Sequence, residues 1–112
     1  MRIPVVLLLT GLSAFGQTVL DRAYAALREK DYDRAIALFG QGLAAEPGRN
    51  AARKDLAYTL LKAGETEAAR EQFAEVMRRD AADAHVALEY AFLAYETKKP
   101  VEARRVFDRL RR

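Results

Sequence analysis

The sequence predicts an all-α protein of stacked helical hairpins from three observations: an internal period, a helical spacing of apolar residues, and turn residues between the segments. Two alanines and a phenylalanine each recur at one fixed distance along the chain. The recurring residues are Ala35, Ala69 and Ala103; Phe39, Phe73 and Phe107; and Ala23, Ala57 and Ala91. A period of this length, about 34 residues, is typical of arrays in which each repeat is one helix-turn-helix unit.

Apolar residues inside each period follow the spacing of one helix face. The positions i, i+3, i+4 and i+7 are occupied by Ala35, Leu38, Phe39 and Gly42 in the first period, and by Ala103, Val106, Phe107 and Leu110 in the third. This spacing gives each helix one apolar stripe. Alanines in both helices of a hairpin let the two axes approach closely.

The first hairpin is expected from two helices with recognisable ends. Thr18 and Asp21 are suited to cap a helix over residues 18–29. Asp31 is expected to cap a second helix over residues 32–45. Pro47 and Gly48 follow and end that helix, since proline lacks the amide donor and glycine tolerates a left-handed exit.

The second and third hairpins carry similar signals. Asn50 is expected to cap a third helix that runs to residue 63 and ends at Gly64. A fourth helix is expected over residues 66–79. Asp83 is expected to open a fifth helix to about residue 97, and Pro100 suits the first position of a sixth helix that runs to the end of the chain.

Residues 1–16 are predicted to be a cleavable signal peptide. One positive charge at Arg2 precedes an apolar run over residues 5–12, and small residues stand at the −3 and −1 positions of a cut before Gln17. The segment is shorter than the roughly 20 apolar residues of a membrane span. We therefore expect an exported protein, periplasmic or secreted if bacterial. Residues 17–112 then form one repeat domain, with repeats at about 16–49, 50–83 and 84–112.

Residues 17–112 resemble the tetratricopeptide repeat family. The middle repeat carries the family pattern most fully, with Leu56, Ala57, Leu60, Gly64, Ala69 and Phe73. The sequence departs from the pattern at Arg22, which stands where a large apolar residue is usual, and at Lys98, which replaces the turn glycine. The resemblance implies a right-handed α-solenoid of three antiparallel helix-turn-helix repeats. It also implies a concave groove, lined by the first helix (helix A) of each repeat, that holds a segment of a partner protein.

The groove prediction assigns ring side chains and charged neighbours to the A helices. Tyr24, Tyr58 and Phe92 stand one period apart and would form a ladder of rings. Mapped from the family, the candidate partner-binding residues are Tyr24, Leu27, Lys54, Tyr58, Leu61, Lys62, His85, Leu88, Phe92 and Tyr95, with Leu20 also expected to face the groove. The alternative is that the rings serve packing within the chain. One branch of the family binds a C-terminal carboxylate with lysine and asparagine, but rings stand at the asparagine positions here.

Catalysis and metal binding are not expected. Cysteine is absent and residues 17–112 contain no serine, so the usual activated nucleophiles are missing. His85 is the single histidine, which makes a poor metal site by itself. No cofactor is expected. The formal net charge of +3 is small and the charges are interspersed, which does not favour a nucleic-acid partner.

The C-terminal segment leaves two further questions open. Its basic residues, among them Arg104, Arg105, Arg109 and Arg111, suit either a solvated helix face or an anionic partner. The apolar side chains of Val106, Phe107 and Leu110 are expected to face outward, so we expect that the chain is part of a longer repeat array, that it self-associates through this end, or that its third hairpin is frayed. A non-enzymatic scaffold that binds a partner segment is the first hypothesis for function. A structural or assembly element, the N-terminal part of a longer repeat array, is the alternative.

Overall fold

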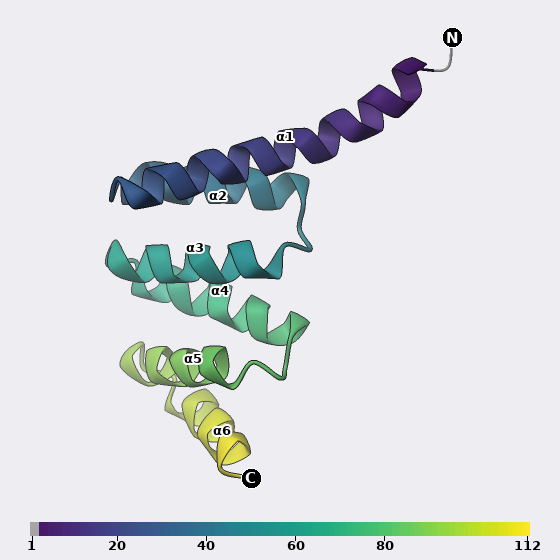
Figure 1. The fold of residues 1–112 in the computed structure, drawn as a ribbon. Helices are drawn as coiled ribbons and strands as arrows, with labels where there is room; N and C mark the ends of the chain where they lie inside the picture. Colours follow the sequence, from purple (N-terminus) through teal and green to yellow (C-terminus); the bar gives the residue numbers. More distant parts are fainter. Residues whose placement is uncertain (1–2) are drawn as a thin grey trace. The chain divides into compact units, whose positions relative to one another are not determined.

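The computed structural model describes the backbone of residues 3–112 and the side chains of residues 16–112. Every regular element in these residues is an α-helix (Figure 1). The helices are α1 (Ile3–Arg28), α2 (Tyr32–Ala45), α3 (Asn50–Lys62), α4 (Thr66–Arg79), α5 (Ala84–Glu96) and α6 (Pro100–Arg111). The chain divides into two compact units, residues 1–52 and 53–112, and the boundary falls in the first turn of α3.

Two predicted aspartate caps are confirmed. The Asp31 carboxylate accepts the Arg34 amide at 3.3 Å ahead of α2, and the Asp83 carboxylate accepts the Val86 amide at 3.1 Å ahead of α5. Each bond satisfies one of the free amides in the first turn of a helix.

The first helix of each hairpin ends in the same way, at positions one period apart. Lys30, Gly64 and Lys98 have positive φ angles of 60°, 83° and 63°. At each end the next amide reaches back five residues, as the Glu65 amide does to the Leu60 carbonyl at 2.9 Å. This is the Schellman arrangement, which favours glycine at the left-handed position. Lysine holds that position in two of the three turns.

The first unit has its core between α1 and α2 (Figure 1). Ala23 and Ala35, predicted to lie in the hairpin contact, are both fully buried. The α2 backbone comes close to α1 at Gly42, where a Cβ atom would stand 2.5 Å from Leu20 Cδ2. A side chain at position 42 would therefore force Leu20 to shift. Phe39 is fully buried in the same core.

The second unit repeats this arrangement in α3 to α6. Ala57, Ala69, Ala91 and Ala103 are all at most 1% exposed, as expected for residues in the hairpin contacts. Phe73 of α4 is fully buried beside Tyr58 of α3. Ala87, Ala91 and Val106 form a cluster that partly buried side chains of α4, α5 and α6 cover. The predicted core stripe of α6 is thereby confirmed at Ala103 and Val106.

Some predicted helix ends are wrong. α1 begins at Ile3, so Thr18 lies inside the helix and does not cap it. The reason is that the chain from residue 5 to residue 17 contains no proline, and single glycines there do not end a helix. Asn50 is the first residue of α3 and lies inside the helix, not ahead of it.

The predicted signal peptide occupies residues 1–16. The side chains of residues 1–15 lie outside the described residues, and cleavage remains a prediction. In the part of the chain that is described, no helix combines the length and the apolar character needed to cross a bilayer.

Candidate partner-binding surface

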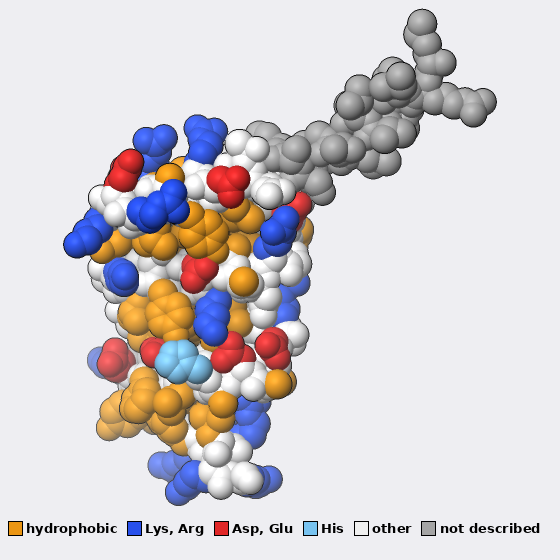
Figure 2. All heavy atoms as spheres, viewed as in Figure 1, with side chains coloured by type: hydrophobic (Ala, Val, Ile, Leu, Met, Phe, Trp, Pro, Cys, Tyr) orange, Lys and Arg blue, Asp and Glu red, His pale blue; other side chains and the backbone are white. Residues whose placement is uncertain are grey.

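α5 carries an exposed apolar strip along one side. Leu88, Phe92 and Tyr95 follow one another at i, i+4 and i+7, and their exposed fractions are 39%, 53% and 68%. Figure 2 shows hydrophobic side chains gathered at the level of α5 on the viewed face. The other sides of α5 are also apolar and are buried, for example at Val86 and Leu93. A helix that is apolar nearly all round is normally covered all round, so this strip is a candidate contact surface.

The strip continues toward α3 through a contact between two A helices of the second unit. The Tyr58 ring stacks on the His85 ring, with 6.4 Å between ring centroids and 28° between planes. One turn earlier on α3, the Lys54 ammonium donates to the Asp83 carboxylate at 2.8 Å. These pairs fix α3 against the start of α5. The second unit thus presents a surface made by two A helices.

The electrostatics of this contact follow from burial and pairing. The hydrogen bond to Asp83 raises the pKa of Lys54 above its ordinary value. The same bond, followed by the bond from the Val86 amide, lowers the pKa of Asp83. Burial raises the pKa of Tyr58, whose hydroxyl has no hydrogen-bond partner among the described residues. At neutral pH the contact therefore holds one ion pair and a neutral phenol.

Each predicted ladder ring packs against the phenylalanine of its own hairpin. Tyr24 meets Phe39 edge to face at 5.0 Å, and Tyr58 meets Phe73 in the same way at 4.9 Å. Phe92 meets Phe107 at 5.3 Å. The three rings therefore do pack within the chain, which was the alternative to a partner-binding role. Tyr24 and Tyr58 remain half-buried, and Phe92 is exposed.

The remaining predicted residues differ in accessibility. Leu27 and Leu61 are half-buried, while Lys62 and His85 are exposed. Leu20 was expected to face the groove but is 5% exposed, because it packs on Gly42. That expectation is wrong for Leu20. Tyr24 and Leu27 belong to the first unit, and the other candidate residues belong to the second.

Lys54 is less available to a partner than the sequence suggested. Its charge is already paired with Asp83, a residue that sequence reasoning assigned only to the cap of α5. No local signal could have revealed the pair, because Lys54 and Asp83 stand 29 positions apart on different helices. Lys62 is exposed. It is therefore the more accessible of the two predicted lysines.

The predicted outward face of α6 is partly wrong. Val106 is only 9% exposed, because it packs into the cluster with Ala87 and Ala91. Phe107 and Leu110 are half-buried at the edge of that cluster. Self-association through this end remains a prediction, and Val106 is not available for it.

Residues 16–112 contain no group of three or more His, Asp or Glu side chains placed to hold a metal ion.

The fold is that of a helical-repeat protein, because its helical hairpins recur at a fixed period. The exposed apolar strip on an A helix is its candidate contact surface. The sequence model of the tetratricopeptide repeat matches residues 26–88 and 60–112. The chain therefore belongs to the tetratricopeptide repeat family, in general a non-enzymatic protein-interaction repeat. The predicted fold class, an α-solenoid of helix-turn-helix repeats, is confirmed. No curated protein matches the sequence.

Solved structures of the same fold resemble the chain at low sequence identity. The second TPR of Spaghetti (RPAP3), bound to the HSP90 peptide SRMEEVD, is 21% identical, with a TM-score of 0.71 over 85% of this chain and 88% of that one. The Arabidopsis OM64 TPR domain is 14% identical, with a TM-score of 0.72 over 88% and 82%. A mutant of MamA is 19% identical, with a TM-score of 0.75 over 86% and 53%, so the chain spans about half of MamA. These likenesses establish the fold alone.

Proposed function

We propose that the protein is a non-enzymatic scaffold that binds a segment of a partner protein on its A helices. The observation that carries this proposal is the strip of Leu88, Phe92 and Tyr95 on α5. Large apolar side chains exposed at helical spacing are stabilised when a partner covers them, at roughly 1.5 to 3 kcal/mol for each fully buried side chain. A rigid helix face suits an extended or helical segment.

The chemistry of the surface indicates what such a segment carries. Tyr95 is exposed and offers an apolar ring with a polar tip, which favours contacts that combine burial with a hydrogen bond. The exposed ammonium of Lys62 adds positive charge on α3. We therefore propose a partner segment with apolar side chains and some negative charge. The acidic peptide bound to the similar Spaghetti domain supports this class of ligand.

Site-specific crosslinking would test the proposal in the producing cells. A photo-crosslinking amino acid replaces Phe92 on α5 in one variant and Glu71, an exposed residue of α4, in a control. We expect discrete protein adducts from position 92 that are absent or much weaker from position 71. Equal adducts from both positions, or none from position 92, would contradict a partner-binding role for the A helices.

We also propose export, from the charge and apolar pattern of residues 1–16. N-terminal sequencing of the protein purified from its producing cells tests it. The expected first residue is Gln17. A chain that retains Met1 or Arg2 would refute cleavage at this position.

A further inference from the structure

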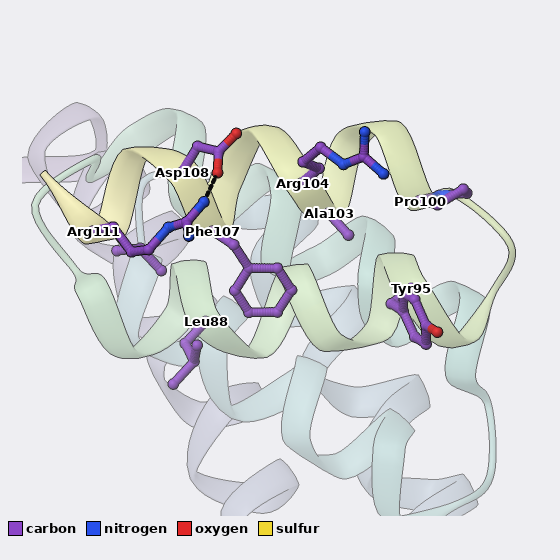
Figure 3. Close-up of a pocket in the computed structure, with 9 residues that line it drawn as sticks. Leu88, Tyr95, Pro100, Ala103, Arg104, Phe107, Asp108 and Arg111 are labelled. Carbon is purple, nitrogen blue, oxygen red and sulfur yellow. Dashed lines mark hydrogen bonds and ion pairs between the residues drawn. The ribbon is translucent and has the colours of Figure 1, made fainter.

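An apolar groove lies between α5 and α6. Leu88 and Tyr95 contribute from α5, and Phe107 and Leu110 contribute from α6, around a volume of about 540 Å³. In Figure 3 the Phe107 ring projects from α6 toward α5, and Leu88 and Tyr95 lie toward the two ends of the groove. Leu88 and Tyr95 thus belong both to this groove and to the exposed strip on α5. All its other lining residues belong to α6.

Positive charge borders this groove. Arg104 and Arg111 line it on α6, and Asp108 between them pairs with Arg111 (Figure 3). Among the described residues, Arg104 makes no ion pair. Residues 98–112 contain seven Lys and Arg side chains against two Asp and Glu side chains, a formal charge of +5, whereas the whole chain carries +3. The basic excess of the chain is thus concentrated in the segment that forms α6, and Arg104 and Arg111 are the two of these side chains that line the groove.

We propose that this groove binds an amphipathic helical segment of a partner protein, with its apolar stripe on Leu88, Phe107 and Leu110 and its acidic side chains beside Arg104 and Arg111. An apolar groove between two helices commonly binds the apolar face of a third helix. Carboxylates on the flanks of that helix complement the arginine border and strengthen docking.

Two other occupants are less favourable. A second copy that docks face to face brings two segments of charge +5 together, and like charges at an interface oppose association. An anionic membrane surface is flat, whereas Leu88 and Phe107 lie along a concave groove. Two residues of the apolar stripe of α6, Ala103 and Val106, are also buried within the protein and are not free to enter a bilayer.

The test uses the full chain and a synthetic peptide of about 15 residues, with leucine at i, i+3, i+4 and i+7 and glutamate on both flanks. Calorimetry compares this peptide with a version that carries glutamine for glutamate. The groove variant is Arg104→Glu with Arg111→Glu. The matched control is Arg105→Glu with Arg109→Glu, which makes the same charge change on exposed positions of α6 that do not line the groove.

The proposal expects saturable binding of the acidic peptide and a weakening of about tenfold or more in the groove variant. The glutamine peptide should bind about tenfold more weakly to the unmodified chain, and the control variant should stay within about threefold. Circular dichroism of both variants checks that helix content is unchanged.

Several outcomes would overturn the proposal. They are no binding of the acidic peptide at about 1 mM, equal loss in the groove and control variants, and equal binding of the two peptides. Stronger binding to vesicles with anionic lipid than to the peptide would assign the charge to a membrane. Sedimentation that finds a dimer which the peptide does not dissociate would assign the groove to a second copy. The groove and control variants leave Phe92 unchanged, and Phe92 does not line the groove, so loss of peptide binding in the groove variant with adducts still formed at position 92 would separate this groove from the proposed partner-binding strip.

Discussion

The Asp83 carboxylate joins α3 to α5, because one oxygen accepts the Lys54 ammonium at 2.8 Å while the other accepts the Val86 amide at 3.1 Å. One side chain thus caps a helix and ties that helix to an earlier one. Both side chains of the ion pair are partly exposed, with 33% of Lys54 and 22% of Asp83 accessible. Water screens such a pair, so the cap is expected to contribute the larger share of stability.

Two substitutions separate these roles. Asp83→Ala removes the cap and the ion pair, and should lower the free energy of unfolding by about 1 to 2 kcal/mol. Asp83→Asn keeps a good capping side chain and removes the ion pair and hydrogen bond with Lys54, and should cost less than about 1 kcal/mol. Urea unfolding followed by circular dichroism measures both. An Asn variant as unstable as the Ala variant would show that the ion pair, not the cap, dominates.

The pKa shifts of Asp83 and Lys54 predict how the contact between α3 and α5 responds to pH. The pKa of Asp83 lies below its ordinary value of 3.8 in the folded chain, so its stabilising effect is present above that value and is lost as the pH falls through the folded pKa. The pKa of Lys54 is raised above 10.5, so its own effect persists up to that value and fades only at higher pH. The unfolding free energies of the unmodified chain and Asp83→Asn should therefore differ most near neutral pH.

That difference should shrink as the pH falls from about 5 to about 2. The comparison cancels the effect of Glu75, whose pKa is also lowered, by hydrogen bonds from Arg78 and Arg79. Urea titrations at several pH values measure the two chains side by side. A difference that stays constant down to pH 2 would mean that the Asp83 charge does not stabilise the fold.

Gly42 and Gly40 offer a matched pair on α2. Alanine favours a helix interior over glycine by about 1 kcal/mol, so Gly40→Ala, which meets nothing within 4 Å, should stabilise the chain by up to that amount. At Gly42 the new Cβ would stand 2.5 Å and 2.7 Å from Leu20 side-chain carbons. Overpacking of this kind costs about 1 to 3 kcal/mol, so Gly42→Ala should destabilise the chain. Thermal unfolding distinguishes the two signs, and equal stabilisation by both would show that Leu20 moves aside freely.

The sequence was sufficient for the features that depend on local chemistry or on the period. Aspartate caps, the turn at Gly64 and the start of α6 at Pro100 are encoded within a few residues. The burial of Phe39 and Phe73 follows from their shared place in the repeat.

Contacts that depend on the relative position of two helices could not be predicted from the sequence. The pairing of Lys54 with Asp83 and the packing of Leu20 on Gly42 each require the relative position of two helices. Helical spacing gave the stripe of Val106 and Phe107 correctly. It did not reveal that Val106 turns into the cluster while Phe107 lines the groove.

The left-handed turns predict a stabilising substitution. Lys98 has a φ of 63° at the position that Gly64 holds in the previous repeat. The left-handed conformation costs a non-glycine residue roughly 1 to 2 kcal/mol, partly offset by the greater freedom of glycine in the unfolded chain. Lys98→Gly should therefore stabilise the chain by about 0.5 to 1 kcal/mol, and Gly64→Lys should destabilise it by a similar amount. Urea unfolding measures both, and a destabilised Lys98→Gly variant would show that the lysine side chain contributes more than its backbone strain.

Phe73 and Phe92, which belong to two different edge-to-face pairs, should differ sharply in their contribution to stability. Phe73 is fully buried, whereas Phe92 is 53% exposed although it contacts Phe107. Phe73→Ala leaves a cavity and should cost about 3 to 5 kcal/mol. Phe92→Ala loses mainly the ring contact and part of its burial, and should cost about 1 kcal/mol. Urea unfolding measures both variants, and near-equal costs would mean that Phe92 belongs to the core, which would remove the reason for assigning it to a partner-binding surface.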